Sequence, residues 1–444
     1  MASMQYLLKD QPNEIKFSTM NEQRKDLVQP MLPWSATRKM IFRFILVYSS
    51  LFILTLSFPH PFIPNIQSAI APFFESMVKW TAVHLFHIDH TYTSKIISDS
   101  TGLYIHLLVL LFLSAFVTLI WTIIDKRRSS YHMLSYWFRT LLSYYLGYYL
   151  ILYGLNKIFK WQFYLPEPNT LFTTVGKTYR DILYWSTMGS SYSYSVFLGT
   201  GELIAGVLLF FRKTRLAGSL ISFVILLNVV AVNFSFDISV KVFSLFLLLL
   251  SVLIASPHFK RLYQFFFTSD TITARPWEPA YYTKNTKQFY IIGKTALIIF
   301  LFSSLLAVYI RTGNYNDDKE KRPLFHGAYD VISFIKNNDT LPPLLTDSYR
   351  WKRVFIHRRG YLVVQSMNDE MQDYGFLCDT TRKEWFIKKE GGGEEAILKY
   401  QQLNDTTIAL STEIKKDQLD IIIRKIDLAR LPLLQHEFNW TIDE

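Results

Sequence analysis

Residues 199–254 read GTGELIAGVLLFFRKTRLAGSLISFVILLNVVAVNFSFDISVKVFSLFLLLLSVLI. Three apolar runs occur in this stretch, separated by a basic RKTR turn and by a short NFSFD interruption. The first run begins before this stretch, at residue 194, and the third ends just after it, at residue 256. Each full run is therefore long enough to cross the hydrocarbon core of a bilayer, which is about 30 Å thick and takes roughly 17–25 helical residues. The stretch therefore predicts three consecutive helices that cross a membrane.

Seven segments of the chain have this length and apolar character. The basic groups between them, such as Lys126–Arg128 and Arg212–Arg215, all fall on one side if the helices alternate in direction. Lysine and arginine are enriched in cytoplasmic loops, so we expect the N-terminus inside and everything after residue 310 outside. This predicts a multi-pass protein of the cytoplasmic (inner) membrane of a bacterium, with the lipid bilayer as its partner. The segments are 40–58, 103–124, 133–157, 194–211, 216–236, 239–256 and 289–310.

The overall charge does not indicate a nucleic-acid partner. The chain has 444 residues, is 50% hydrophobic and carries a net charge of +11. Acidic and basic residues nearly balance beyond residue 311, so the positive excess belongs to the ends of the apolar segments. Cys378 is the only cysteine, which excludes an intrachain disulfide and any cysteine-cluster metal site.

The part of the chain after residue 310 has the composition of a water-soluble domain. Its apolar residues alternate with a period of two, and Arg359-Gly360, Asn404-Asp405 and similar pairs separate the short runs. Many short, evenly spaced strands predict an antiparallel meander closed into a small barrel, lipocalin-like or streptavidin-like. The candidate strands are 329–335, 352–358, 361–367, 373–378, 384–388, 396–400, 406–411, 419–425 and 436–441.

Several charged residues lie where lipid would reject them. A charge at the centre of a bilayer costs about 2.5–3.5 kcal/mol on insertion scales, so such groups usually face a helix-bundle interior and pair with one another. By the topology above, Lys157, Asp237 and Lys241 share the outer depth and Glu202 lies a turn or two deeper. We predict that these four residues form one polar cluster that opens outward. Asn228 and Asn233 support it, and Arg139 anchors the inner edge.

Each member of this cluster also has a purely structural explanation. Lys157 ends its segment and could extend its ammonium group to the headgroups. Asp237 suits the N-terminus of the sixth helix, where a negative charge is stabilised, and Lys241 follows at the i+4 position. Gly199, Gly201 and Gly206 fit close helix packing better than a dinucleotide fingerprint, since no strand precedes them.

The sequence HLFHIDH at residues 84–90 contains three histidines. Imidazole and carboxylate ligands suit zinc or copper. The spacing of His84, His87 and His90 spreads the rings around a helix, so we favour a polar patch at the membrane interface over a metal site. No metal site is predicted elsewhere.

Three stretches resemble the DoxX-like membrane family, in the form with a C-terminal extension found in Bacteroidetes. They are YGLNKIFKWQF (153–163), LYWSTMGSSYSYSVFLGTGELIAGVLLFFRKTRLAGSL (183–220) and NVVAVNFSFDISVKVFSLFLLLLSVLIASPHFKRL (228–262). The resemblance implies a four-helix bundle and singles out Lys157, Glu202, Asp237 and Lys241. The family's namesake is similar to a small subunit of a thiosulfate:quinone oxidoreductase, which implies redox-associated work in the membrane. The inner-loop cysteines of some relatives are absent here, which puts direct thiol chemistry in doubt.

The resemblance and the apolar segments together predict a membrane all-α bundle of about seven helices, followed by a soluble all-β domain. The expected parts are a cytoplasmic segment (1–39), two membrane helices with an amphipathic outer helix over 64–86 (40–132), the DoxX-like four-helix core (133–265), an inner connector with the seventh helix (266–310) and the periplasmic β domain (311–444).

We expect an outward-opening pocket that binds a quinone, a lipid headgroup or a small anion. In this hypothesis Glu202 moves protons, while Lys157 and Lys241 hold a quinone oxygen or an anion. The alternative is a non-catalytic scaffold or assembly factor, in which the cluster only fastens the bundle and the β domain binds a protein partner. The sequence leaves open whether the chain is an enzyme. A transporter is disfavoured because no duplicated halves are evident.

Overall fold

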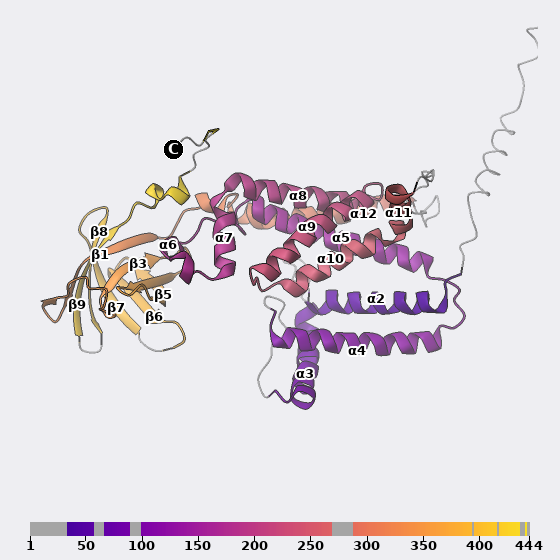
Figure 1. Ribbon diagram of the computed structural model, residues 1–444, viewed down its shortest axis with the longest axis horizontal. Coiled ribbons are helices and arrows are strands. Elements are labelled where there is room, and N and C mark those ends of the chain that lie inside the picture. The colour runs from indigo at the N-terminus through magenta and orange to yellow at the C-terminus, as the bar shows by residue number, and fades with distance from the viewer. Residues whose placement is uncertain are drawn as a thin grey trace, which may run out of the picture. The chain divides into compact units, whose positions relative to one another are not determined.

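The computed structural model (Figure 1) describes residues 33–56, 66–88, 99–268, 287–392, 395–414, 417–435 and 440–441. The predictions made for most of 1–39, for the connector around 269–286 and for nearly all of strand 436–441 lie outside the described residues. The chain divides into two compact units. The first comprises Met1–Leu146, Leu209–Leu226 and Ser239–Ile298, and the second comprises Gly147–Leu208, Leu227–Ile238 and Ile299–Glu444.

All seven predicted spans are helical. Six helical stretches among the described residues are long and apolar enough to cross a membrane, and α5 is not one of these six. Helix α5 has 27 residues, but it contains Arg139, Lys157 and many tyrosines, which lower its hydropathy. The count of seven spans therefore stays a prediction. The helices are α2 (Ala36–Leu56), α4 (Thr101–Ile124), α5 (His132–Ile158), α8 (Tyr192–Phe210), α9 (Arg215–Ser235), α10 (Lys241–Ala255) and α12 (Lys287–Thr312).

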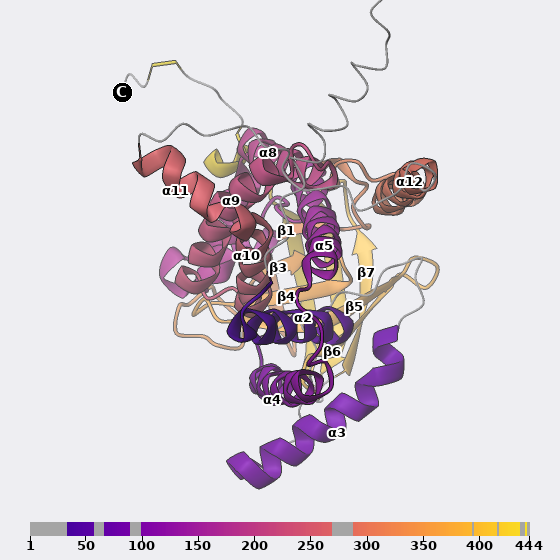
Figure 2. The same cartoon turned by 90° about the vertical axis from the view of Figure 1, so that its right-hand side faces the viewer.

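In the first unit, α2 packs along α4 and the helix α3 (Ile66–Phe86) crosses α4 (Figure 2). The helix predicted over 64–86 is therefore present. Arg43 lies inside α2 and is only 2% exposed. Its guanidinium donates to the Tyr131 and Thr122 hydroxyls and to the Asp125 carbonyl, so all three of its nitrogens are used within the unit.

In the second unit, glycines bring α5 and α8 into close contact. A Cβ atom on residue 199 in place of the Gly199 hydrogen would lie 2.5 Å from the Gly154 carbonyl oxygen and 3.0 Å from Cβ of Lys157. A Cβ on Gly206 would lie 2.9 Å from the Gly147 carbonyl oxygen. Only residues without a side chain permit this approach of two backbones. The predicted helix packing is therefore confirmed for Gly199 and Gly206.

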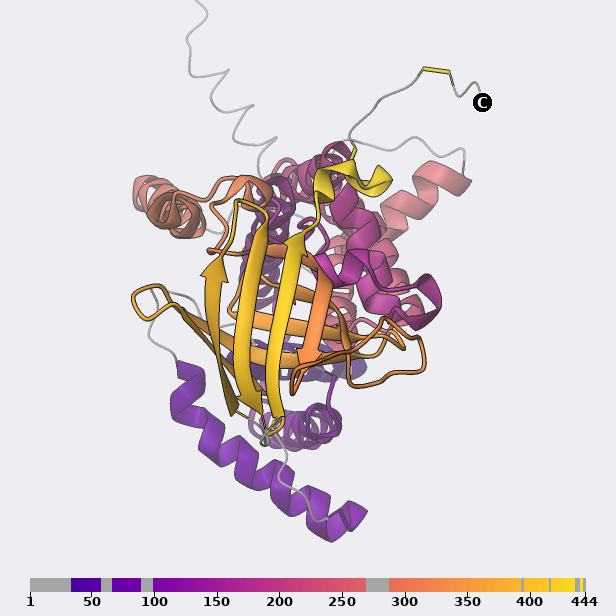
Figure 3. The same cartoon turned by 90° about the vertical axis from the view of Figure 1, so that its left-hand side faces the viewer.

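The β domain is an antiparallel barrel, as predicted (Figure 3). The strands pair in chain order from β1 to β9, and β9 closes the barrel by pairing with β1, while β2 is a two-residue extension beside β1. The strands are β1 (Gly327–Lys336), β2 (Asp339–Thr340), β3 (Trp351–Ile356), β4 (Tyr361–Ser366), β5 (Met371–Asp379), β6 (Glu384–Lys389), β7 (Glu395–Gln402), β8 (Thr407–Ile414) and β9 (Asp417–Lys425).

Apolar side chains fill the interior of the barrel. Trp385 is fully buried there and contacts Phe325, Phe376 and Tyr400. In the described part of the chain this interior is a packed core, unlike the open cup that a lipocalin uses for its ligand. The expectation of a lipocalin-like barrel is therefore confirmed for the strand topology.

Strand β4 is buried on both faces. Leu362 and Val364 point into the core, whereas Val363 packs outside the barrel against Ala328 and Phe355. The outer layer is completed by Phe172, which follows the short helix α6 (Pro168–Leu171) and stacks on Phe355. The loop between α5 and α8 therefore packs on the outer wall of the barrel. It also contains the 3-10 turn η1 (Val175–Lys177) and the helix α7 (Arg180–Ser190).

We predict that Gly199→Ala lowers the stability of the helix pair. The added methyl group would overlap the Gly154 carbonyl, and overpacking of this kind costs about 1–3 kcal/mol. Gly293→Ala is the matched control, because Gly293 lies in α12 and a methyl group added there would meet nothing within 4 Å. Thermal unfolding in detergent should show a lower Tm for the first variant alone. Equal Tm values for both variants would contradict the close contact.

Candidate functional site

The structure brings together two of the predicted site residues, Lys157 and Glu202. The Lys157 ammonium donates to both carboxylate oxygens of Glu202, over 2.9 and 2.8 Å. The side chains are only 8% and 6% exposed. An ammonium has three N–H donors, so two are used by Glu202. The pair is therefore a buried, charge-assisted interaction between α5 and α8.

Aromatic rings cover this ion pair. The Lys157 ammonium lies 5.7 Å from the ring centre of Tyr153 and 5.4 Å from that of Phe163, which is 3% exposed. Phe163 in turn contacts Tyr184 and Trp185 of α7. Rings placed in this way stabilise the cation and keep water from it. The outer loop thus forms an aromatic cover over the pair.

A carboxylate that the sequence did not indicate lies beside Lys241, while the predicted pairing of Lys241 with Asp237 stays a prediction. The Lys241 ammonium lies 4.0 Å from the Asp99 carboxylate in the first unit. The Asp99 carboxylate also accepts hydrogen bonds from the backbone N–H groups of Lys241 and Val242, so it caps the start of α10. The prediction that Asp237 caps this helix is wrong. Asp237 precedes the helix by four residues, is exposed and has a left-handed backbone with φ of 54°.

The three supporting residues have separate surroundings. Asn233 is 4% exposed, and its side-chain amide nitrogen has no hydrogen-bond partner among the described residues. Asn228 is exposed on α9, so it does not face the bundle interior. Arg139 is half-buried and donates to Ser135 on its own helix, which suits the anchor predicted for it. The structure therefore brings Lys157 and Glu202 together, and the convergence of Asp237 and Lys241 with them stays a prediction.

The histidine patch remains a prediction in part. His84 places its Nδ1 2.9 Å from the Trp80 carbonyl and stacks on the Trp80 ring within α3. His87 has a left-handed backbone just after that helix. His90 lies outside the described residues.

A second buried lysine, Lys160, follows the end of α5. It is fully buried, donates to the Gly189 carbonyl over 2.6 Å and lies 3.3 Å from the Asp318 carboxylate. Its backbone is left-handed, with φ of 61°, a conformation that costs a non-glycine residue about 1–2 kcal/mol. Burial lowers the pKa of Lys160, and Asp318 opposes that effect. A lysine is retained here in spite of the backbone cost because its charge joins α7 to the turn η3 (Asp317–Lys319).

Arg358, in the turn between β3 and β4, fastens the barrel to the outer loop. Its guanidinium pairs with the carboxylates of Glu167 and Asp317 and donates to the Leu165 carbonyl. It also stacks 3.7 Å from the Tyr164 ring centre, and its side chain is 9% exposed. We call Arg358, Glu167 and Asp317 the clasp. The sequence identified this turn correctly but missed the clasp, since nothing local pairs residues so far apart along the chain.

The clasp holds Glu167 in its charged form. Burial alone would raise the pKa of Glu167, but His326, Arg358 and His357 outweigh burial and lower the pKa to about 2. A lowered pKa means that the unfolded chain binds more protons than the folded protein below about pH 4.3.

We predict that Arg358→Lys loosens the barrel from the outer loop. Lysine keeps the charge but loses the planar fork and the stacking surface, and a hydrogen bond to a charged group contributes about 1.5–3 kcal/mol. Arg359→Lys is the matched control, because Arg359 is exposed in the same turn. Hydrogen exchange in residues 164–170 should rise in the first variant alone. Unchanged protection in Arg358→Lys would argue against the clasp.

We predict a pH dependence of stability that belongs to Glu167. Its contribution is complete at pH 6, decreases as the pH falls below about 4.3 and is lost below about pH 2, where folded and unfolded chains are both protonated. The difference in unfolding free energy between the unsubstituted protein and Glu167→Gln should therefore shrink between pH 6 and pH 2. A difference that is constant over this range would show that the charge of Glu167 is not stabilising.

Comparison with known proteins finds a relative for part of the chain. No protein-family model matches the chain, and no solved structure matches it. The uncharacterised protein YwoB of Bacillus subtilis (strain 168) is 32% identical over 110 residues, which are 25% of this chain and 70% of that relative. The relative is therefore much shorter than this chain. Because the match covers most of the relative, the chain belongs to the same family as the YwoB protein.

Proposed function

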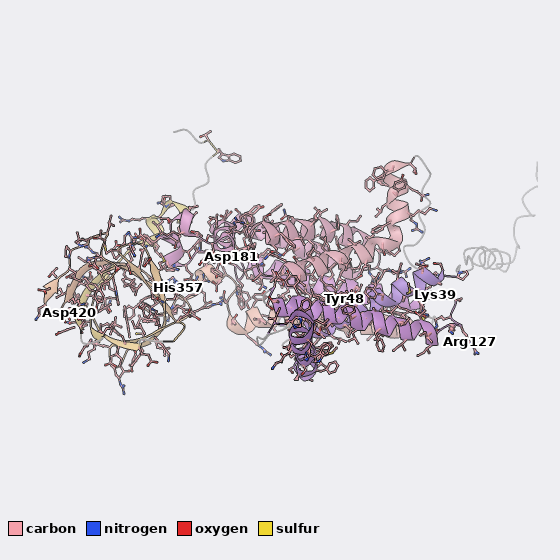
Figure 4. The ribbon with its side chains drawn as sticks, turned by 60° about the horizontal axis from the view of Figure 1, so that its bottom comes forward. Lys39, Tyr48, Arg127, Asp181, His357 and Asp420 are labelled. Carbon is pink, nitrogen blue, oxygen red and sulfur yellow. The ribbon has the colours of Figure 1, made fainter. Side chains whose placement is uncertain are left out.

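We propose that the chain is a DoxX-like protein of the cytoplasmic membrane, with seven spans including α5, the N-terminus inside and the barrel in the periplasm. Basic residues located at one end of the α2–α4 helix pair support this orientation. The Lys39 ammonium donates to the Arg128 carbonyl, and Lys39 and Arg127 lie at the same end of the α2–α4 pair (Figure 4). Positive residues at one end of a helix pair mark its cytoplasmic side.

The proposed activity of the membrane half is the binding of an amphiphile by Lys157 and Glu202. The observation that carries this proposal is the burial of their ion pair within helices of membrane length. Replacing a buried ion pair by apolar residues is often neutral or stabilising, so stability alone does not account for keeping it. Charged residues within membrane segments usually mark a functional site.

The geometry suits a headgroup that carries an acceptor oxygen. One Lys157 N–H is left over after the two hydrogen bonds to Glu202, and it lies beneath the rings of Tyr153 and Phe163. A quinone carbonyl or a lipid phosphate oxygen would accept this hydrogen bond once Phe163 moves aside. Glu202 is placed to take up a proton. A bound quinone would supply two-electron redox chemistry.

A second candidate function is a scaffold whose barrel binds a protein partner. The clasp favours it, because all three guanidinium nitrogens of Arg358 are engaged in holding the barrel on the outer loop. In that case the Lys157–Glu202 pair serves the same purpose as the clasp, by holding α5 and α8 together under the loop.

We predict that Glu202→Gln separates the two candidates. The variant keeps the shape of the side chain and removes the charge that positions Lys157. For amphiphile binding, the quinone or phospholipid that co-purifies in mild detergent should fall at least tenfold, with folded protein still recovered. Asp99→Asn is the matched control, since it also removes a carboxylate beside a lysine, and it should leave bound amphiphile unchanged.

The scaffold makes a different prediction for the bound amphiphile in the same variants. Glu202→Gln should then leave the amount of bound quinone or phospholipid per folded protein unchanged, although its Tm falls. A quinone-free and lipid-free preparation of the unsubstituted protein that binds neither on addition would rule out amphiphile binding.

A further inference from the structure

A large cleft lies between the outer loop and the outer wall of the barrel, within the second unit. Its volume is about 1350 Å³, and its walls come from residues 162–186 on one side and from β3, β4 and β5 on the other. Figure 4 labels one residue from each wall, Asp181 on α7 and His357 beside the turn of the clasp. Ligand sites for small molecules usually occupy about 300–1,000 Å³, so this cleft has room for an extended ligand.

Three buried polar atoms on residues that line this cleft have no hydrogen-bond partner among the described residues. They are Oε1 of Gln162, Oδ1 of Asn169 and Nε2 of His357. Leaving a buried donor or acceptor unpaired costs about 1–3 kcal/mol. Several such atoms in one cleft indicate that a ligand supplies the missing hydrogen bonds.

The nature of these atoms restricts the ligand. Two of the three are oxygens of amide groups, which accept hydrogen bonds and do not donate them. Their partner must therefore carry O–H or N–H groups. A phosphate, a sulfate or a quinone carbonyl offers only acceptors and would leave these oxygens unpaired.

The charge of the cleft points to a neutral ligand. Five lysines and arginines and five aspartates and glutamates line it, so their charges cancel. Some of these charged groups are already in ion pairs. Arg358 is paired in the clasp, and the Lys352 ammonium lies 2.5 Å from the Asp369 carboxylate. A highly charged ligand would have to displace such pairs.

Flat apolar surfaces alternate with the polar groups. Tyr164 and Tyr361 are 37% and 41% exposed, Tyr179 is 80% exposed, and Trp185 also lines the cleft. Sugar rings present C–H faces that pack on aromatic rings and hydroxyl groups that donate at their edges. A site with acceptors, aromatic faces and no net charge is complementary to such a ligand.

We propose that this cleft binds a neutral carbohydrate chain on the outer side of the membrane. Oxygens of Gln162 and Asn169 would accept hydrogen bonds from its hydroxyl groups, with His357 as the third polar contact. The sugar rings would stack on Trp185 and Tyr361. This site is separate from the Lys157–Glu202 pair, and only its placement on the outer side rests on the orientation proposed above.

The test is a glycan array probed with the full-length protein in detergent, followed by titration of intrinsic tryptophan fluorescence with the best-bound oligosaccharide. We expect binding of neutral oligosaccharides, and at least a tenfold loss of affinity in Asn169→Ala and in Trp185→Ala. Gln372→Ala is the control, because this barrel amide lies outside the cleft lining and should bind normally. Circular dichroism and gel filtration establish that each variant is folded.

Three results would overturn the proposal. The first is an array without any bound neutral glycan. The second is a preference for phosphorylated or sulfated glycans, since the free oxygens cannot accept from those groups. The third is a loss of affinity in Gln372→Ala equal to that in the cleft variants. Competition of a tri-alanine peptide with the oligosaccharide would also overturn the proposal, because it would assign the cleft to a peptide instead.

Discussion

The ion pair between Lys157 and Glu202 is the interaction on which the second unit depends. A lone carboxylate or ammonium at bilayer depth is unfavourable by several kcal/mol, so each residue requires the other. The two side chains meet only if α5 and α8 approach closely, which Gly199 and Gly154 permit. Phe163 then closes over the pair. The small residues, the opposite charges and the aromatic cover therefore all reduce the free-energy cost of burying these two charges.

Ion pairs also connect the end of α5 to the barrel. Just after the end of α5, the ammonium of Lys160 lies 3.3 Å from the carboxylate of Asp318, which follows α12. Asp317, next to it, pairs with Arg358 of the barrel. Buried charges therefore follow one another from the bundle to the β domain. The outer face of β4 is buried for the same reason, since the loop that carries Glu167 packs on it.

Much of this fold could be predicted from the sequence because its signals are local. Apolar length identified seven helices, and a period of two with turn residues identified β1 and β3 to β9. The sequence placed Lys157 and Glu202 in one polar cluster because both charges needed a partner, but it did not single out their pair. The tight two-residue strand β2 gave no such signal.

The remaining errors concern contacts between distant parts of the chain. Asp237 satisfied every local rule for a helix cap, yet Asp99 occupies that position from more than a hundred residues away. Arg358 looked like an ordinary turn residue for the same reason. The cleft could not be foreseen, because its walls come from the loop 162–186 and from strands that begin at residue 351.

A double-mutant cycle on Lys157→Met and Glu202→Gln tests the central claim most directly. If the pair is kept for binding and not for stability, each single variant should lose stability by leaving one buried polar group unpaired, as for buried pairs in general at about 3–5 kcal/mol. The double variant should recover the Tm of the unsubstituted protein and still fail to retain quinone or phospholipid. Additive losses of stability, or a double variant that retains the amphiphile, would contradict the account.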